Sequence, residues 1–136
     1  AQLSGGMAQR TALARCLARQ PEVLLLDEPF GALDEVTRAD MQQLLLKVIG
    51  QHRTAALLIT HDIDEALLLS DRVLLLGNSP ARTLGQWHID LPQPRTQRVE
   101  ELGALRIDIL KTLRRASRTV EPTPTPLPSE AVHVHG

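Results

Sequence analysis

Short apolar runs alternate with longer amphipathic segments along much of this chain. The run at 23–26 is wholly apolar, and similar runs follow at 55–59 and 73–76. Such runs are typical of parallel strands covered on both faces. We expect these three strands, a more polar edge strand at 84–89, and helices at 7–19, 34–51 and 62–69. Alternating strands and helices predict an α/β fold with a parallel sheet and flanking helices.

The pattern changes after Pro92 and Pro94. Apolar residues then recur at helical spacing, at Val99, Leu102, Leu105, Ile109 and Leu113. From residue 121 onward, prolines alternate with small residues, which is typical of extended or disordered chain. We therefore expect three parts: an α/β domain at 1–94, an amphipathic helix at 95–118 and a disordered Pro-rich tail at 119–136.

Composition narrows the possible functions. The 136 residues suffice for one modest core, and the net charge of -1 predicts no broad basic surface. Phe30 and Trp87 are the aromatic residues of the chain, so platforms for base stacking are missing. Both observations argue against nucleic acid as a partner. The single Cys16 excludes an internal disulfide, and no apolar run approaches the roughly 20 residues that cross a bilayer.

Polar residues follow two of the predicted strands. Asp27 and Glu28 come after the run at 23–26, and His61 follows the run at 55–59. Ligands of parallel sheets bind where strands end. There, Asp27 is placed to hold Mg²⁺, and Glu28 is placed to orient and deprotonate a water molecule. Acids also end strands simply because loops are solvated, and a lone His is usually structural. The residues alone leave both interpretations open.

Ser4, Gly5 and Gly6 open the first predicted helix. The N–H groups at a helix start attract anions, and glycines let a phosphate approach the backbone closely. The alternative is an ordinary Ser N-cap beside a flexible turn. Asp34 is placed to cap the second helix, which is the structural alternative to a binding role for this residue.

Taken together, these segments resemble the motifs of ABC ATPases. Residues 3–10, LSGGMAQR, are similar to the signature motif, although the family usually has Gln in place of Met7. That Gln would complete a capping box with Ser4, and Met7 does not. The run ending in Asp27 and Glu28 is similar to Walker B with its catalytic Glu. Residues 31–34, GALD, resemble the D-loop, with Gly31 replacing the usual Ser, and residues 60–62 resemble the H-loop.

The resemblance implies a P-loop NTPase-like parallel sheet with flanking helices, the carboxy-terminal half of an ABC ATPase domain. ATP and Mg²⁺ are the implied cofactors. In the family, such subunits form head-to-tail dimers that enclose two ATPs. The implied roles are metal binding by Asp27, catalysis by Glu28 and His61, and nucleotide binding by Ser4, Gly5, Gly6 and Asp34. Ser4, Gly5 and Gly6 would then serve the partner's ATP.

One family motif is missing. No G-x-x-x-x-G-K-[ST] occurs in the chain, and that loop supplies the phosphate cradle, a Lys and a Mg²⁺ ligand. The chain also lacks an initiator Met, so we expect that it is truncated at its amino end. We further expect that the chain alone neither binds ATP tightly nor hydrolyses it.

The Met7 variant and the segments at 73–80 and 90–95 resemble importer ATPases of the nitrate, sulfonate and taurine group. This implies a peripheral protein on the cytoplasmic face of the plasma (inner) membrane. Its partners would be a second ATPase subunit, transmembrane permease subunits and, indirectly, a solute-binding protein. Two alternatives stay open: a non-transport ABC ATPase, and a non-catalytic fragment of a degenerate ABC gene.

Overall fold

The computed structural model describes residues 5–77 and 80–119. Every helix and strand expected from the pattern is present, with ends that differ by a few residues. They are α1 (Gly5–Ala18), β1 (Val23–Asp27), α2 (Glu35–His52), β2 (Ala55–Ile59), α3 (Ile63–Leu69), β3 (Arg72–Leu76), β4 (Thr83–His88) and α4 (Val99–Arg118). Ser4 and the Pro-rich tail from residue 120 lie outside the described residues. The division of the chain at residues 94 and 118 stays a prediction.

The strands of the described part form two sheets of two strands each. β1 and β2 are parallel, in register from Val23 opposite Ala55 to Asp27 opposite Ile59. β3 instead pairs with β4 in the antiparallel sense. The expectation that β3 continues the parallel sheet is therefore wrong for these residues. β4 follows β3 after a short connection, and closing such a short loop costs little chain entropy.

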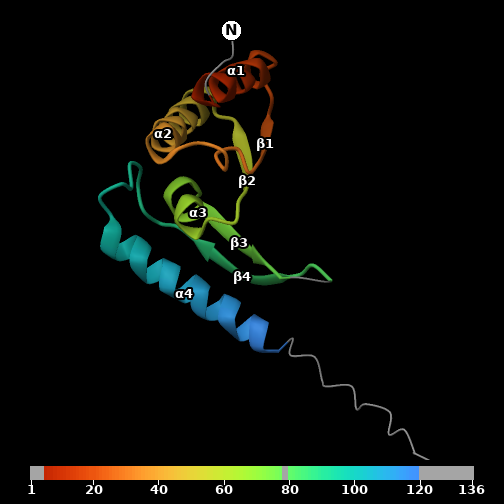
Figure 1. The fold of residues 1–136 in the computed structure, drawn as a ribbon, viewed down its shortest axis with the longest axis vertical. Helices are drawn as coiled ribbons and strands as arrows, with labels where there is room; N and C mark the ends of the chain where they lie inside the picture. Colours follow the sequence, from red (N-terminus) through yellow and green to blue (C-terminus); the bar gives the residue numbers. More distant parts are fainter. Residues whose placement is uncertain (1–4, 78–79, 120–136) are drawn as a thin grey trace, which may run out of the picture.

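Two hydrophobic clusters divide the molecule into two lobes (Figure 1). The first lobe contains α1, α2, β1 and β2, and its buried cluster is formed by Leu24, Phe30, Leu33, Met41 and Leu45. The second lobe contains α3, α4, β3 and β4, with Leu67, Ile89 and Ile109 at its centre. Each lobe has only a small buried cluster, so the stability of the whole molecule also depends on contacts between the lobes.

Only one face of the strands is covered in the described part of the chain. Leu24 is 4% exposed on the side of the helices, whereas its neighbour Leu25 is 65% exposed. Burial on both faces was expected. That expectation is wrong here, because α1 and α2 pack on the side of Leu24. The uncovered apolar side chains of the strands are Val23, Leu25, Leu57, Ile59, Leu74 and Leu76. Exposed apolar side chains on strands are typical of surfaces that another polypeptide segment covers.

Two aspartates cap helices. The carboxylate of Asp34 accepts hydrogen bonds from the backbone N–H and the hydroxyl of Thr37, and these bonds lower the pKa of Asp34. Asp62 accepts a hydrogen bond from the backbone N–H of Glu65 and so caps α3. A capping box also needs the Glu65 side chain to turn back to the cap. Here that carboxylate accepts a hydrogen bond from Gln42 instead.

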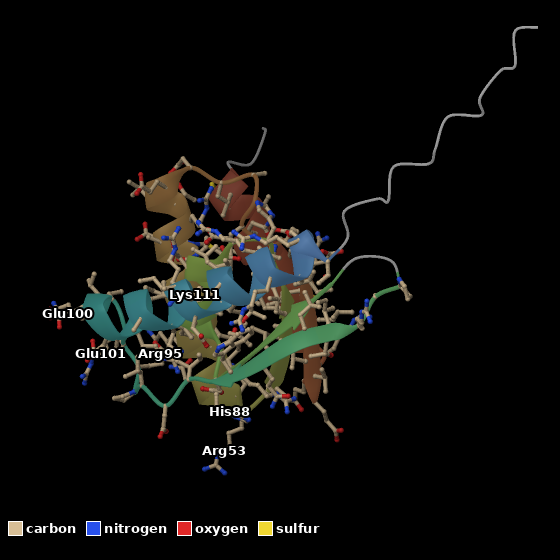
Figure 2. All side chains as sticks on the ribbon, turned by 90° about the horizontal axis from the view of Figure 1, so that it is seen from below. Arg53, His88, Arg95, Glu100, Glu101 and Lys111 are labelled. Atoms are coloured by element: carbon tan, nitrogen blue, oxygen red, sulfur yellow. The ribbon has the colours of Figure 1, made fainter. Side chains whose placement is uncertain are left out.

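Arg95 is a charged residue inside the second lobe, 1% exposed (Figure 2). Its guanidinium donates to the carbonyl oxygens of Leu67 and Ser70 at the end of α3, at 2.9 and 2.8 Å. It also donates to the carbonyls of Leu91 and Ile89. A helix end with unpaired carbonyls favours a cation. Arg95 therefore fastens the segment before α4 to α3 and β4.

Replacing Arg95 with Met should destabilise the chain by about 3 kcal/mol, because several buried carbonyl groups lose their donor. Arg98→Met is the matched control. Arg98 is exposed and forms one ion pair with Glu101, so its loss should change the free energy of unfolding by at most about 0.5 kcal/mol. Urea denaturation of both variants measures the difference. Equal losses of stability in the two variants would contradict the structural role that we assign to Arg95.

The adjacent residues Leu24 and Leu25 test which strand face is covered. Leu24→Ala should destabilise the chain by about 2–4 kcal/mol, because it opens a cavity in the first cluster. Leu25→Ala removes an exposed side chain and should cost at most about 0.5 kcal/mol. Thermal unfolding followed by circular dichroism compares the two variants. A larger loss in Leu25→Ala would show that the exposed face is covered in solution.

Candidate functional site

The register of β1 and β2 brings the polar residues at their ends together. Asp27 lies opposite Ile59 in the last pair of the parallel ladder. The backbone N–H of Glu28 then donates to the carbonyl of Ile59 at 2.8 Å. The chain continues from Ile59 through Thr60 to His61. Glu28 and His61, which are 33 positions apart in the sequence, therefore meet at one edge of the sheet.

Two hydrogen bonds join Glu28 to His61. Oε1 of Glu28 accepts from the backbone N–H of His61 at 3.0 Å and lies 2.8 Å from Nδ1 of its ring. The side chains are 40% and 85% exposed, respectively. The pair thus lies at the surface, where a bound molecule has access to it.

Glu28 has a backbone conformation that non-glycine residues rarely adopt. Its φ is 45°, in the left-handed region. For a residue with a Cβ, this region costs about 1 kcal/mol or more. The ladder bond to Ile59 and the carboxylate bonds to His61 hold Glu28 in place. Strain of this kind at a polar surface position is a reason to look for function there.

The charge on Glu28 changes the protonation of His61. The hydrogen bond to Glu28 and the attraction of its carboxylate raise the pKa of the His61 imidazole, and the carboxylates of Asp62 and Glu65 raise it further. Protonated His61 carries a positive charge at an open edge. Such a group is suited to contact an anionic ligand.

Asp27 lies beside this pair at the exposed end of β1. A carboxylate is a ligand that Mg²⁺ accepts, although Mg²⁺ requires six donors. Residues 5–77 and 80–119 hold no group of three or more His, Cys, Asp or Glu side chains suited to a metal ion. Asp27 therefore fits a magnesium site as one ligand, and the other donors have to come from a ligand or from further polypeptide.

Gly5 and Gly6 belong to a second group of predicted site residues. A Cβ on Gly5 would lie 2.9 Å from Cδ2 of Leu33, and one on Gly6 would lie 2.7 Å from Cγ2 of Thr37. The first turn of α1 therefore packs closely on the loop at 31–34 and on the start of α2. Asp34 belongs to the same region, and both of its carboxylate oxygens are bonded to Thr37.

Arg38 and Gln42 support the site, and neither is among the residues predicted from the sequence. The guanidinium of Arg38 donates to the carbonyls of Leu33 and Phe30, at 2.8 and 3.3 Å. It thereby fixes the loop that ends at Asp34. Gln42, on the same helix, is 7% exposed. The sequence contains a signal for Gln42, because this polar residue lies among the apolar residues Met41, Leu44 and Leu45 of α2.

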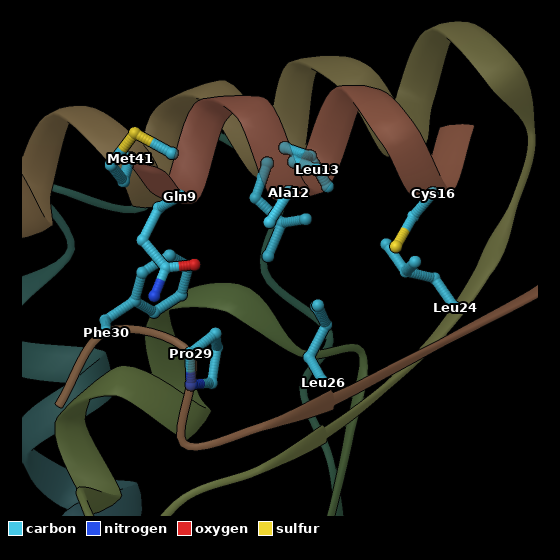
Figure 3. A pocket seen from close by; sticks show the side chains of 10 residues that line it. Gln9, Ala12, Leu13, Cys16, Leu24, Leu26, Pro29, Phe30 and Met41 are labelled. Atoms are coloured by element: carbon cyan, nitrogen blue, oxygen red, sulfur yellow. The ribbon is translucent and has the colours of Figure 1, made fainter. Parts of the chain in front are cut away.

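An apolar pocket of about 80 Å³ lies under α1 (Figure 3). Its wall includes Leu13 and Cys16 of α1, Leu24 and Leu26 of β1, and Phe30. The volume is far below the roughly 300 Å³ of the smaller ligand pockets. Glu28 and His61 are not among the lining residues. The pocket is therefore a gap in the first cluster, apart from the Glu28–His61 pair.

No helix in the described ranges is long and apolar enough to span a bilayer.

The chain is similar to several known sequences. Residues 1–31 match the family model described as ABC transporter. The aliphatic sulfonates import ATP-binding protein SsuB 2 of Burkholderia lata is 48% identical over 123 residues, which are 90% of this chain and 45% of that protein. The nitrate import ATP-binding protein NrtC of Synechococcus elongatus is 48% identical over 126 residues, 86% of this chain and 19% of NrtC. The chain thus spans less than half the length of these relatives.

Solved structures agree with the sequences. The dimeric post-hydrolysis state of the ATP-binding cassette MJ0796, bound to ADP and Pi, has a TM-score of 0.55 and 34% identity, covering 67% of this chain and 38% of that one. The cbiO1 protein of Clostridium perfringens, part of the ABC transporter complex cbiONQ, has a TM-score of 0.58 and 28% identity. That match covers 86% of this chain and 43% of cbiO1. The resemblance to importer-type ABC ATPases and the fold class are confirmed.

The pH dependence of the Glu28–His61 pair can be measured. Since the pKa of His61 is raised in the folded chain, the ion pair stabilises the fold below the unfolded pKa of about 6.5. This contribution is lost as the pH rises through the raised folded pKa. Glu28→Gln removes the charge and should lower the pKa of His61 toward its ordinary value. NMR titration of the His61 ring protons measures the change.

Glu22→Gln is the control for this titration. Glu22 is an exposed carboxylate at the opposite end of β1, so its loss should leave the His61 titration unchanged. An equal shift in both variants, or none in Glu28→Gln, would contradict the pairing of Glu28 with His61.

Proposed function

Because this chain belongs to the ABC transporter ATP-binding family, we propose that it is the ATP-hydrolysing half of an importer ATPase domain. The double hydrogen bond between Glu28 and His61, beside Asp27, carries this proposal. In this role, Glu28 orients and deprotonates the attacking water. His61 contacts both Glu28 and the terminal phosphate of ATP. Asp27 would hold Mg²⁺ together with phosphate oxygens, and a bound Mg²⁺ would supply charge neutralisation for phosphoryl transfer.

Gly5 and Gly6 have a different role in the proposal. With Ser4, which lies outside the described residues, they bind the ATP held by a second ATPase subunit in a head-to-tail dimer. Their position in the first turn of α1 supports this role, since the first N–H groups of a helix bind phosphate well. Asp34 lies between Leu33, on which Gly5 packs, and Thr37, on which Gly6 packs. Changes in the loop at 31–34 would therefore reach the dimer interface.

The relatives named above suggest the process that this ATPase powers. They are named for import of aliphatic sulfonates and of nitrate, and a further relative from Synechococcus elongatus is named for bicarbonate transport. We propose uptake of a small solute of this kind, such as nitrate, a sulfonate or taurine. The subunit would lie on the cytoplasmic face of the membrane against permease subunits, with a solute-binding protein acting indirectly. Solute selectivity would belong to the permease and the binding protein.

The missing Walker A sequence limits what these residues do alone. Without its phosphate cradle and Lys, the 136 residues supply a general base and one metal ligand, but no tight site for the β- and γ-phosphates. The proposal therefore includes that the isolated chain does not hydrolyse ATP.

Completion with a related segment tests both parts of the proposal. The probe is the part of SsuB 2 from Burkholderia lata that this chain does not match, co-expressed with the chain. We expect no turnover by the chain alone, and ATP hydrolysis by the completed pair. Glu28→Gln should then lower the rate by about 100-fold or more, because a general base contributes that much. Phosphate release measures the rate.

Glu22→Gln serves as the control and should keep the rate within about two-fold, as expected for a surface change away from the site. Near-normal turnover in the completed Glu28→Gln variant would show that Glu28 is not the base. Turnover by the unpaired chain would contradict its dependence on the missing segment. A completed pair that assembles without hydrolysing ATP would favour a non-catalytic fragment.

A further inference from the structure

The two lobes share few bonds near the candidate site. Their buried clusters are separate, and Leu69 of α3 is a side chain of the second lobe that packs on the first cluster. The β1–β2 sheet and the β3–β4 sheet are not hydrogen-bonded to each other in the described part of the chain. His61 lies where the chain passes from β2 of the first lobe to α3 of the second. Its position depends on how α3 is held against the first lobe.

A buried hydrogen bond joins the lobes at this place. Nε2 of Gln42, in α2, donates to Oε2 of Glu65, in α3, at 3.1 Å. The two residues are 7% and 5% exposed. A buried carboxylate without a donor is costly, so this bond favours one placement of α3 over others. Apolar contact such as that of Leu69 is less directional.

Glu65 lies one helical turn after His61. Its backbone N–H donates to Asp62, the cap of α3, while its side chain reaches Gln42. The bond to Gln42 therefore anchors the turn of α3 that directly follows His61. The bonds from His61 to Glu28 anchor the residue before that turn. The start of α3 is therefore fixed to the first lobe by two contacts, Glu28–His61 just before the helix and Gln42–Glu65 in its first turn.

We propose that Gln42 and Glu65 are positioning residues, whose buried hydrogen bond holds α3 where His61 reaches Glu28. Without the bond, the first turn of α3 would no longer be held in one placement, because the apolar contact that remains between the lobes is less directional. His61 would move with it and lose its contact with Glu28. The pair would then serve catalysis without touching ATP, since the site needs His61 and Glu28 in contact. The catalytic meaning of the proposal rests on the proposed function.

The test measures the His61 backbone amide in the purified chain without nucleotide. This N–H donates to Glu28, and its hydrogen exchange, followed by NMR, reports the contact directly. The reference is the Glu28 amide, which donates to Ile59 within the β1–β2 sheet. In Gln42→Leu we expect protection of the His61 amide to fall about ten-fold or more. Protection of the Glu28 amide should change by no more than about two-fold.

The double variant Gln42→Leu/Glu65→Leu separates positioning from stability. Replacing a buried polar pair with apolar residues of similar volume usually preserves stability. It also keeps the test decisive if Gln42→Leu does not fold. We expect near-normal unfolding with the same loss of His61 protection. Gln43→Leu, at the adjacent exposed position of α2, is the matched control and should change neither quantity.

Normal His61 protection in the stable double variant would overturn the proposal, since the bond would then be replaceable by any packing. An equal loss of protection at His61 and Glu28 would also overturn it, because that is the result of general loosening. The measurement needs no ATP. Absence of hydrolysis in the completed protein would therefore count against the proposed function and leave this result unaffected.

Discussion

The parallel register of β1 and β2 determines where Asp27, Glu28 and His61 lie. Asp27 pairs with Ile59, so the residues that follow the two strands begin at the same edge. A slip of two residues would move His61 by about 6.6 Å along the sheet, beyond reach of Glu28. A slip of one would turn Leu24 away from the helices. The burial of Leu24 in the first cluster therefore also specifies the site.

Much of this arrangement can be predicted from the sequence. The apolar runs identify β1 and β2, and parallel strands end at one edge, so Asp27, Glu28 and His61 were expected together. The pairing of β3 was not predictable in the same way. An apolar run indicates a strand but does not identify its neighbour. β3 pairs with the strand that a short connection supplies, whereas the free edge of β2 has no partner among the described residues.

Other features depend on contacts that no local pattern reveals. The spacing of Asp62 and Glu65 predicts a capping box, yet burial against α2 directs the Glu65 side chain to Gln42. Arg95 belongs to a residue type that is usually exposed. It is buried because carbonyls of residues 67 and 70, far earlier in the sequence, face its guanidinium. The left-handed backbone of Glu28 likewise follows from the ladder bond and the contact with His61.

The candidate site lies at the boundary between the two hydrophobic clusters, and a small chain has to hold its residues in place there. Apolar clusters stabilise each lobe but tolerate small displacements between lobes, because apolar contact has little directionality. A catalytic base and the residue that contacts it must keep their separation within a fraction of an ångström. Buried hydrogen bonds supply that constraint, since a small displacement leaves a polar group without a partner. Arg95 fixes the far end of α3 within the second lobe, and Glu65 bonds its near end to α2 of the first lobe. α3 is thus held by hydrogen bonds at both ends, although one face of the strands is uncovered.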